Sequence, residues 1–123
     1  MKSYRQILEE VKKEIPEVTV EEVKKKKDKQ EDFVLLDVRD DDEYREGYIP
    51  DALHITRGML EFSIENYVPD RDQKIIIHCA AGLRSLLAAK SLREMGYTDT
   101  ASMAGGYRAW AAAGFPTAKD RPM

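Results

Sequence analysis

Two short apolar runs constrain the fold of this chain most. Residues 33–38 (FVLLDV) and 74–78 (KIIIH) are nearly continuous in branched apolar side chains. Such runs are typical of strands that are buried on both faces of a parallel sheet. Segments with helical periodicity lie before, between and after them. The alternation of strands and helices predicts an α/β fold, with helices on both faces of a central, mostly parallel sheet.

The helical segments carry recognisable start and stop signals. Ser3 with Gln6, and Thr19 with Glu22, have the spacing of a capping box, and Pro16 ends the first of these two helices. We expect a first helix over 3–15 and a last short strand over 101–103. Further helices are expected over 40–46, 59–67 and 83–95, and a final one follows the pair of glycines at 105–106 and runs through 110–113.

Length and composition place the chain among small single-domain proteins. With 123 residues, 42% of them hydrophobic, it can form one core without disulfides. We therefore expect a single domain over 1–123, with the helix at 3–15 packed on it and a frayed tail at 119–123.

The charge balance and the single cysteine bear on location and partners. The formal net charge is −3, from 20 basic and 23 acidic residues, which argues against a nucleic-acid-binding surface. No stretch resembles a signal peptide or a membrane span. One cysteine permits no intrachain disulfide, which fits a reducing compartment. We expect a cytoplasmic protein that binds neither nucleic acid nor membranes.

The segment 78–85 (HCAAGLRS) joins the most apolar strand to the most regular helix. Ligands of open α/β sheets bind beyond the carboxyl ends of the strands, where a helix N-terminus favours an anion. A thiol at this position, with Arg84 close by, should have a lowered pKa and act as a thiolate nucleophile. The backbone can curl around the sulfur and direct its N–H groups inward, because the next residues are small: Ala80, Ala81 and Gly82.

These residues also have structural interpretations. Cys79 could be a small apolar residue at the end of a buried strand, but the glycine and arginine that follow it favour a functional loop. Asp37 and Arg39 fit a salt bridge on the scaffold, and Arg39 is also a candidate source of positive potential at the mouth of the site. One cysteine and two scattered histidines provide no metal-ligand set.

Three blocks in the right order resemble the rhodanese (sulfurtransferase) domain family, specifically its small single-domain members. They are LLDVRDDDEYREGYIPDALHI (35–55), HCAAGLRS (78–85) and MAGGYRAWAAAGFP (103–116), and the resemblance extends over about 19–116. It implies a three-layer α/β/α fold around a five-stranded parallel sheet.

The same resemblance implies a sulfurtransferase with Cys79 as the catalytic residue. The cysteine would carry a sulfane sulfur as a persulfide, taken from thiosulfate or another persulfide, and pass it to a nucleophilic acceptor such as cyanide. No metal or organic cofactor is needed, and a protein partner in a sulfur relay is an additional expectation. The expected substrate-binding residues are Ala80, Ala81, Gly82, Leu83, Arg84, Ser85 and Arg39.

Two positions in the loop bear on the sulfur donor. Ala80 stands where some thiosulfate-using members carry an arginine, and Leu83 is bulkier than the usual small residue. With Arg84 turned inward to hold the loop, Arg39 and Arg57 are the nearest remaining cations. We therefore expect thiosulfate, a dianion, to be a poor donor with a high KM.

Three other functions are compatible with parts of the sequence: a cysteine phosphatase, a non-catalytic module and a redox sensor. Cysteine phosphatases need an arginine six positions after the cysteine, whereas Arg84 is five positions after Cys79. A non-catalytic module that binds a partner or relays sulfur is the main alternative. A redox sensor is a third reading, weakened because the sequence has no second cysteine to resolve an oxidised one.

Overall fold

A computed structural model describes residues 1–120. Within these residues, no helix combines the length and the apolar character that crossing a bilayer requires. In chain order, the elements are α1 Tyr4–Glu14, β1 Glu17–Val18, α2 Val20–Asp28, β2 Val34–Asp37, α3 Asp41–Glu46, β3 Leu53–His54, η1 Arg57–Met59, α4 Leu60–Tyr67, β4 Ile75–His78, α5 Arg84–Glu94, β5 Thr100–Met103 and α6 Gly106–Ala112.

The five strands form one parallel sheet in the order β1-β5-β4-β2-β3. The two apolar runs of the sequence, β2 and β4, are neighbours in its middle, with Leu36 opposite Ile77. All residues of β4 are buried, as expected for a strand covered on both faces. The prediction of an α/β fold with a central parallel sheet is therefore confirmed.

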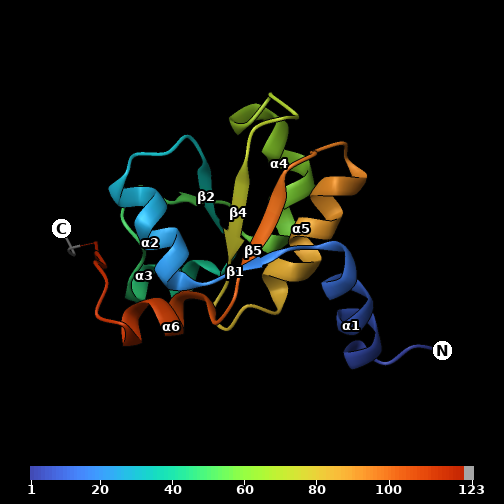
Figure 1. Ribbon diagram of the computed structural model, residues 1–123, viewed down its shortest axis with the longest axis horizontal. Coiled ribbons are helices and arrows are strands. Elements are labelled where there is room, and N and C mark those ends of the chain that lie inside the picture. The colour runs from blue at the N-terminus through green and yellow to red at the C-terminus, as the bar shows by residue number, and fades with distance from the viewer. Residues whose placement is uncertain (121–123) are drawn as a thin grey trace.

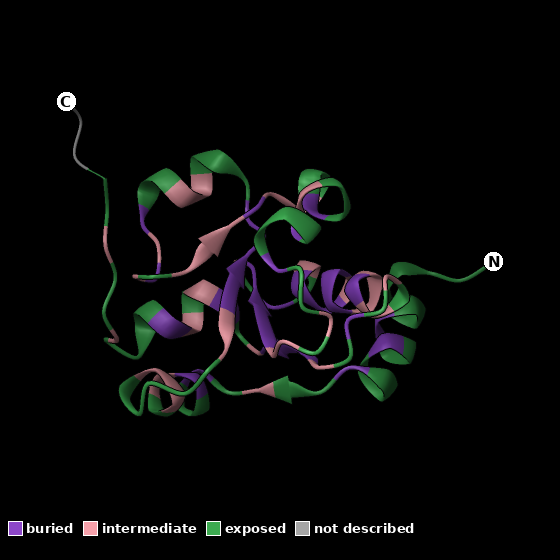
Figure 2. Cartoon of the chain, turned by 90° about the horizontal axis from the view of Figure 1, so that it is seen from above, coloured by how far each residue is buried: buried purple, intermediate pink, exposed green. Residues whose placement is uncertain are grey.

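Helices cover both faces of the sheet, which gives three layers (Figure 1). Alternate residues of each strand enter opposite cores. Leu36 and Ile77 pack with α1, α4 and α5, whereas Leu35 and Ile76 pack with α2 and α6. Figure 2 shows the result, with buried residues gathered in the strands and on the inner sides of the helices.

Local sequence signals explain most element boundaries. Both capping boxes form, with the side chains of Ser3 and Thr19 accepting hydrogen bonds from the third residue of each helix. Gly47 ends α3, as expected. The structure adds two strands that no pattern indicated, β1 and β3, and each has only two residues. They extend the sheet at its two edges, where short strands are common.

The C-terminal segment is partly outside the described residues. Of the expected frayed tail at 119–123, only the first two residues are described. Lys119 lies 3.5 Å from a carboxylate oxygen of Glu46, and Asp120 accepts a hydrogen bond of 2.8 Å from the Tyr48 hydroxyl. Residues 121–123 lie beyond the described part of the chain.

Candidate active site

Cys79 follows the last residue of β4, the central strand, and precedes the loop that leads into α5. The residue is 1% exposed, yet it lines a cavity of about 250 Å³ at the carboxyl edge of the sheet. The loop contributes Ala80, Ala81, Leu83 and Arg84 to the same cavity. The structure therefore brings most of the sequence-predicted site residues together around the sulfur.

Hydrogen-bond donors surround the Cys79 sulfur. The Gly82 N–H donates to Sγ over 3.1 Å, and the Ser85 hydroxyl lies 3.6 Å from it. Burial by itself would raise the pKa of the thiol, but the hydroxyl of Ser85 and the backbone N–H groups of Ser85, Gly82 and Ala81 outweigh it and lower the pKa. The thiolate is thus stabilised mainly by donors within its own loop.

The Ser102 hydroxyl contacts the Ser85 hydroxyl and orients it. Ser85 Oγ lies 2.7 Å from Ser102 Oγ on β5, and both side chains are fully buried. When Ser102 donates to Ser85, the Ser85 hydroxyl is free to donate to the sulfur. This chain of two hydroxyls connects the thiolate to the neighbouring strand.

Removal of the Ser85 hydroxyl should therefore raise the pKa of Cys79. We expect the Ser85→Ala protein to be alkylated with a midpoint at higher pH than the wild type, whose midpoint lies below the roughly 8.5 of a free cysteine. The rate of alkylation by iodoacetamide as a function of pH measures both values. Ser91→Ala, a change on the outer part of α5, is the matched control, and an equal shift in that variant would contradict the role of Ser85.

The N-terminal turn of α6 fixes the loop from the other side. The N–H groups of Tyr107 and Arg108 donate to the carbonyl oxygens of Cys79 and Ala80 over 2.8 and 3.1 Å. Because these carbonyls point toward α6, the N–H groups of the loop are free to face the sulfur. The close approach requires Gly106, where an added Cβ would lie 2.5 Å from the Cys79 oxygen.

Arg84 is occupied by an ion pair. Its guanidinium donates to the two carboxylate oxygens of Glu43 on α3 over 2.8 and 2.9 Å, and Asp40 lies 4.0 Å away. The hydrogen bonds from Arg84 lower the pKa of Glu43 to about 2. Arg84 thus ties the loop to α3, and its charge is largely neutralised.

The structure does not bring Arg39 to the cavity that contains Cys79. Its side chain is buried, and its guanidinium donates to Asp37 over 2.9 Å and to the Gly47 carbonyl over 2.7 Å. The aromatic ring of Tyr107 covers its other face. Of its two expected roles, the geometry accordingly matches the scaffold salt bridge and places no free charge of Arg39 at the mouth of the site.

Two residues at the mouth of the cavity were not predicted from the sequence as site residues. Tyr4 of α1 and Arg108 of α6 both line it. Arg57, by contrast, is paired with Glu61 at 2.8 Å and lies outside the cavity lining, which corrects the expectation that it is a nearby cation. Tyr4 lies outside the three blocks that carry the resemblance, and Arg108 lies within the third block, which gave it no role at the site. Each is an exposed residue that reaches the cavity through the packing of its helix.

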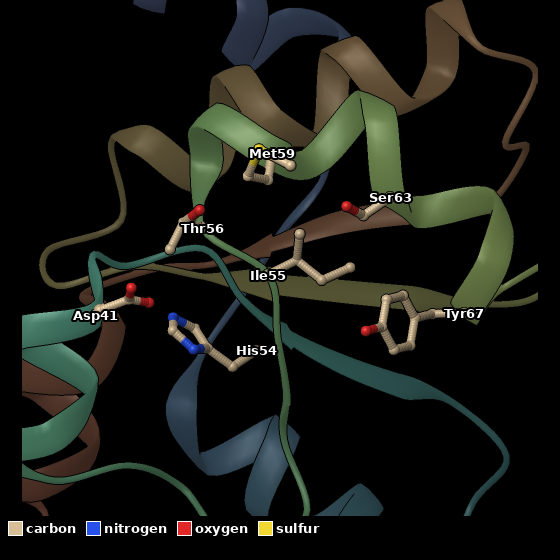
Figure 3. A pocket seen from close by; sticks show the side chains of 7 residues that line it. All are labelled: Asp41, His54, Ile55, Thr56, Met59, Ser63 and Tyr67. Carbon is tan, nitrogen blue, oxygen red and sulfur yellow. The ribbon is translucent and has the colours of Figure 1, made fainter.

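A second and slightly larger hollow, of about 280 Å³, lies between α3 and α4. Figure 3 shows Asp41 and His54 toward one end of it and Ser63 and Tyr67 toward the other. Cys79 is absent from its lining. His54 belongs to β3, and its ring stacks on that of Tyr44.

The fold and the loop together define an α/β/α protein with a cysteine at the carboxyl end of its central strand. The chain belongs to the rhodanese-like domain family, since the sequence model of that family matches residues 19–113.

Known proteins of similar sequence align with most of this chain. YtwF of Bacillus subtilis, described as a candidate sulfurtransferase, is 37% identical over 97 residues, which is 79% of this chain and 91% of that protein. YrkF of the same organism, described as a candidate sulfur carrier protein, is 35% identical over 78% of this chain and 51% of its own length. Among solved structures, a Rhodopseudomonas palustris protein of unknown function, described as a possible tyrosine phosphatase, has a TM-score of 0.87 and 36% identity, with 94% of each chain covered.

Proposed function

We propose that this protein is a sulfurtransferase that carries sulfane sulfur as a persulfide on Cys79. The thiolate attacks the outer sulfur of the donor, and a new S–S bond forms. The bond between that sulfur and the rest of the donor breaks, and its electron pair leaves with the donor fragment. A nucleophilic acceptor such as cyanide then takes the outer sulfur as thiocyanate, and the Cys79 thiolate is restored.

The observation that carries this proposal is the set of donors around Cys79 at the base of a cavity. The Gly82 N–H and the Ser85 hydroxyl contact the sulfur, and the loop lines the space in front of it. An outer sulfur in that space would bear the negative charge of the persulfide. Donors that are already positioned stabilise such a charge without further reorganisation.

The length of the loop argues against a phosphatase, despite the description of the Rhodopseudomonas relative. A phosphatase needs a wider loop and an arginine that binds two oxygens of the phosphate. Only four residues separate Cys79 from Arg84, and both oxygens of Glu43 already occupy its guanidinium. The smaller ring suits a single sulfur atom better than a tetrahedral anion.

Intact-mass measurement tests the proposal directly. After incubation with thiosulfate and removal of excess donor, we expect the protein to gain the mass of one sulfur atom. The gain should disappear on treatment with dithiothreitol or cyanide, and cyanide should yield one equivalent of thiocyanate. Incubation with a range of sulfane-sulfur donors that never produced this adduct would refute the proposal.

A sulfur-relay module is the second candidate, and the description of YrkF as a sulfur carrier favours it. Such a module would form the same persulfide but deliver it to a protein acceptor. Turnover with cyanide in the presence of excess donor separates the two functions. Repeated turnover supports the enzyme, whereas a persulfide that reacts with cyanide much more slowly than with a protein thiol supports the relay.

A further inference from the structure

Three side chains from separate segments form one part of the lining of the Cys79 cavity, which we call the wall. Tyr4 comes from α1, which precedes the region matched by the family model, Leu83 from the loop, and Arg108 from α6. Tyr4 and Leu83 are 52% and 43% exposed, which is high for large apolar side chains. The wall therefore presents apolar surface to whatever enters the cavity.

Arg108 supplies the available positive charge of this wall. Within residues 1–120, its side chain takes part in no hydrogen bond or ion pair, and its backbone N–H donates to the Ala80 carbonyl. Arg84, the other cation of the cavity, is held by Glu43 through two hydrogen bonds. The cavity thus combines one unpaired cation with an aromatic ring and an aliphatic side chain.

This combination matches some sulfur donors better than others. Thiosulfate is a small, strongly hydrated dianion, and it would lose hydration against Tyr4 and Leu83 without gaining comparable partners. An organic donor with one negative charge would place its charge near Arg108 and bury its apolar part against the other two side chains. The volume of about 250 Å³ is close to the lower end, about 300 Å³, of pockets that hold small molecules.

We propose that Tyr4, Leu83 and Arg108 select an organic sulfane-sulfur donor that carries an apolar group and a single negative charge. This inference rests on the proposed sulfurtransferase function and specifies its substrate class. With benzenethiosulfonate as the probe, the Cys79 thiolate attacks the outer sulfur. Benzenesulfinate leaves with the bonding electron pair, and the persulfide keeps the second negative charge, so that atoms and charges balance.

The test compares kcat/KM for benzenethiosulfonate and thiosulfate, with cyanide as the acceptor in both assays. For the apolar contacts the readout is the ratio of the two values, because the probes differ in intrinsic reactivity and a change in the ratio reports recognition of the aromatic group. Tyr4→Ala should lower this ratio about tenfold, as expected for lost apolar contact, and Tyr4→Phe should restore it. Arg5→Ala is the control, since Arg5 adjoins Tyr4 on α1 but does not line the cavity.

The charge of Arg108 is tested in the same assays. Arg108→Ala should lower kcat/KM for benzenethiosulfonate about tenfold at low salt, and Arg108→Lys should recover most of the loss, with both effects reduced by added salt. An Arg5→Ala effect of equal size would show that the loss reflects overall charge and would overturn the role of Arg108.

The outcomes distinguish a failure of the proposed substrate class from a failure of the proposed sulfurtransferase function. If thiosulfate and benzenethiosulfonate both load Cys79 but Tyr4→Ala leaves their ratio unchanged, the substrate class is wrong and the sulfurtransferase stands. If neither donor loads the cysteine, the proposed function fails and the inference falls with it.

Discussion

Replacement of Cys79 by serine is expected to lower sulfur transfer to cyanide on the order of a thousandfold or more, the loss typical of a removed nucleophile. The serine hydroxyl has a similar size but stays protonated at neutral pH, so it cannot attack the donor sulfur. The Cys79 side chain packs in the main core, and this small change should leave the fold intact. Thiocyanate production measures the activity, and far-ultraviolet circular dichroism checks the fold.

The same variant also tests whether Cys79 is the residue that carries the sulfur. Because the sequence contains one cysteine, Cys79→Ser should also gain no sulfur in the intact-mass experiment. Turnover near that of the wild type in a folded Cys79→Ser protein would remove the nucleophile assignment. Ser63→Ala, a change in the other hollow, should leave turnover unchanged and serves as the control.

The second large effect is expected from Gly106→Ala. At φ +58° the new Cβ would lie 2.5 Å from the Cys79 oxygen and 2.7 Å from the Ala80 oxygen, and these are backbone atoms that cannot move aside alone. We expect a loss of about 2–3 kcal/mol in unfolding free energy and a fall in Tm of roughly 10 °C. Displacement of the loop should reduce kcat/KM about a hundredfold.

Gly114→Ala provides the matched control for that prediction. Gly114 also has a positive φ, +76°, but an added Cβ there would meet nothing within 4 Å. This variant should lose only about 1 kcal/mol from backbone strain and keep its activity. Thermal unfolding gives Tm and steady-state kinetics give kcat/KM for both variants. Equal kinetics for the two proteins would mean that the contact between α6 and the loop does not position the sulfur.

The fold could be predicted from the sequence where the local signals were long and consistent. The strands β2 and β4 are continuous apolar runs, and both capping boxes mark their helices. The two missed strands, β1 and β3, have two residues each, which is too short for any periodicity to appear. Their pairing is set by neighbours far along the chain.

The site was predictable only as far as it is contiguous in sequence. Cys79 and its loop form one segment, so their proximity in space follows from the chain itself. The salt bridge between Arg39 and Asp37, two positions apart, was among the expectations. The partner of Arg84 is Glu43, 41 positions away. That pairing depends on how α3 docks beside the sheet, and local patterns carry no information about it.

The ion pair between Arg84 and Glu43 also has a consequence in acid. With its pKa lowered to about 2, Glu43 keeps its charge below the pH at which an ordinary glutamate, at about 4.3, would be half protonated. The stability that the pair contributes is complete above pH 4.3 and is lost only as the pH falls toward 2. Between pH 5 and 9 the ion pair therefore stays formed, and a change of Cys79 reactivity in that range does not arise from protonation of Glu43.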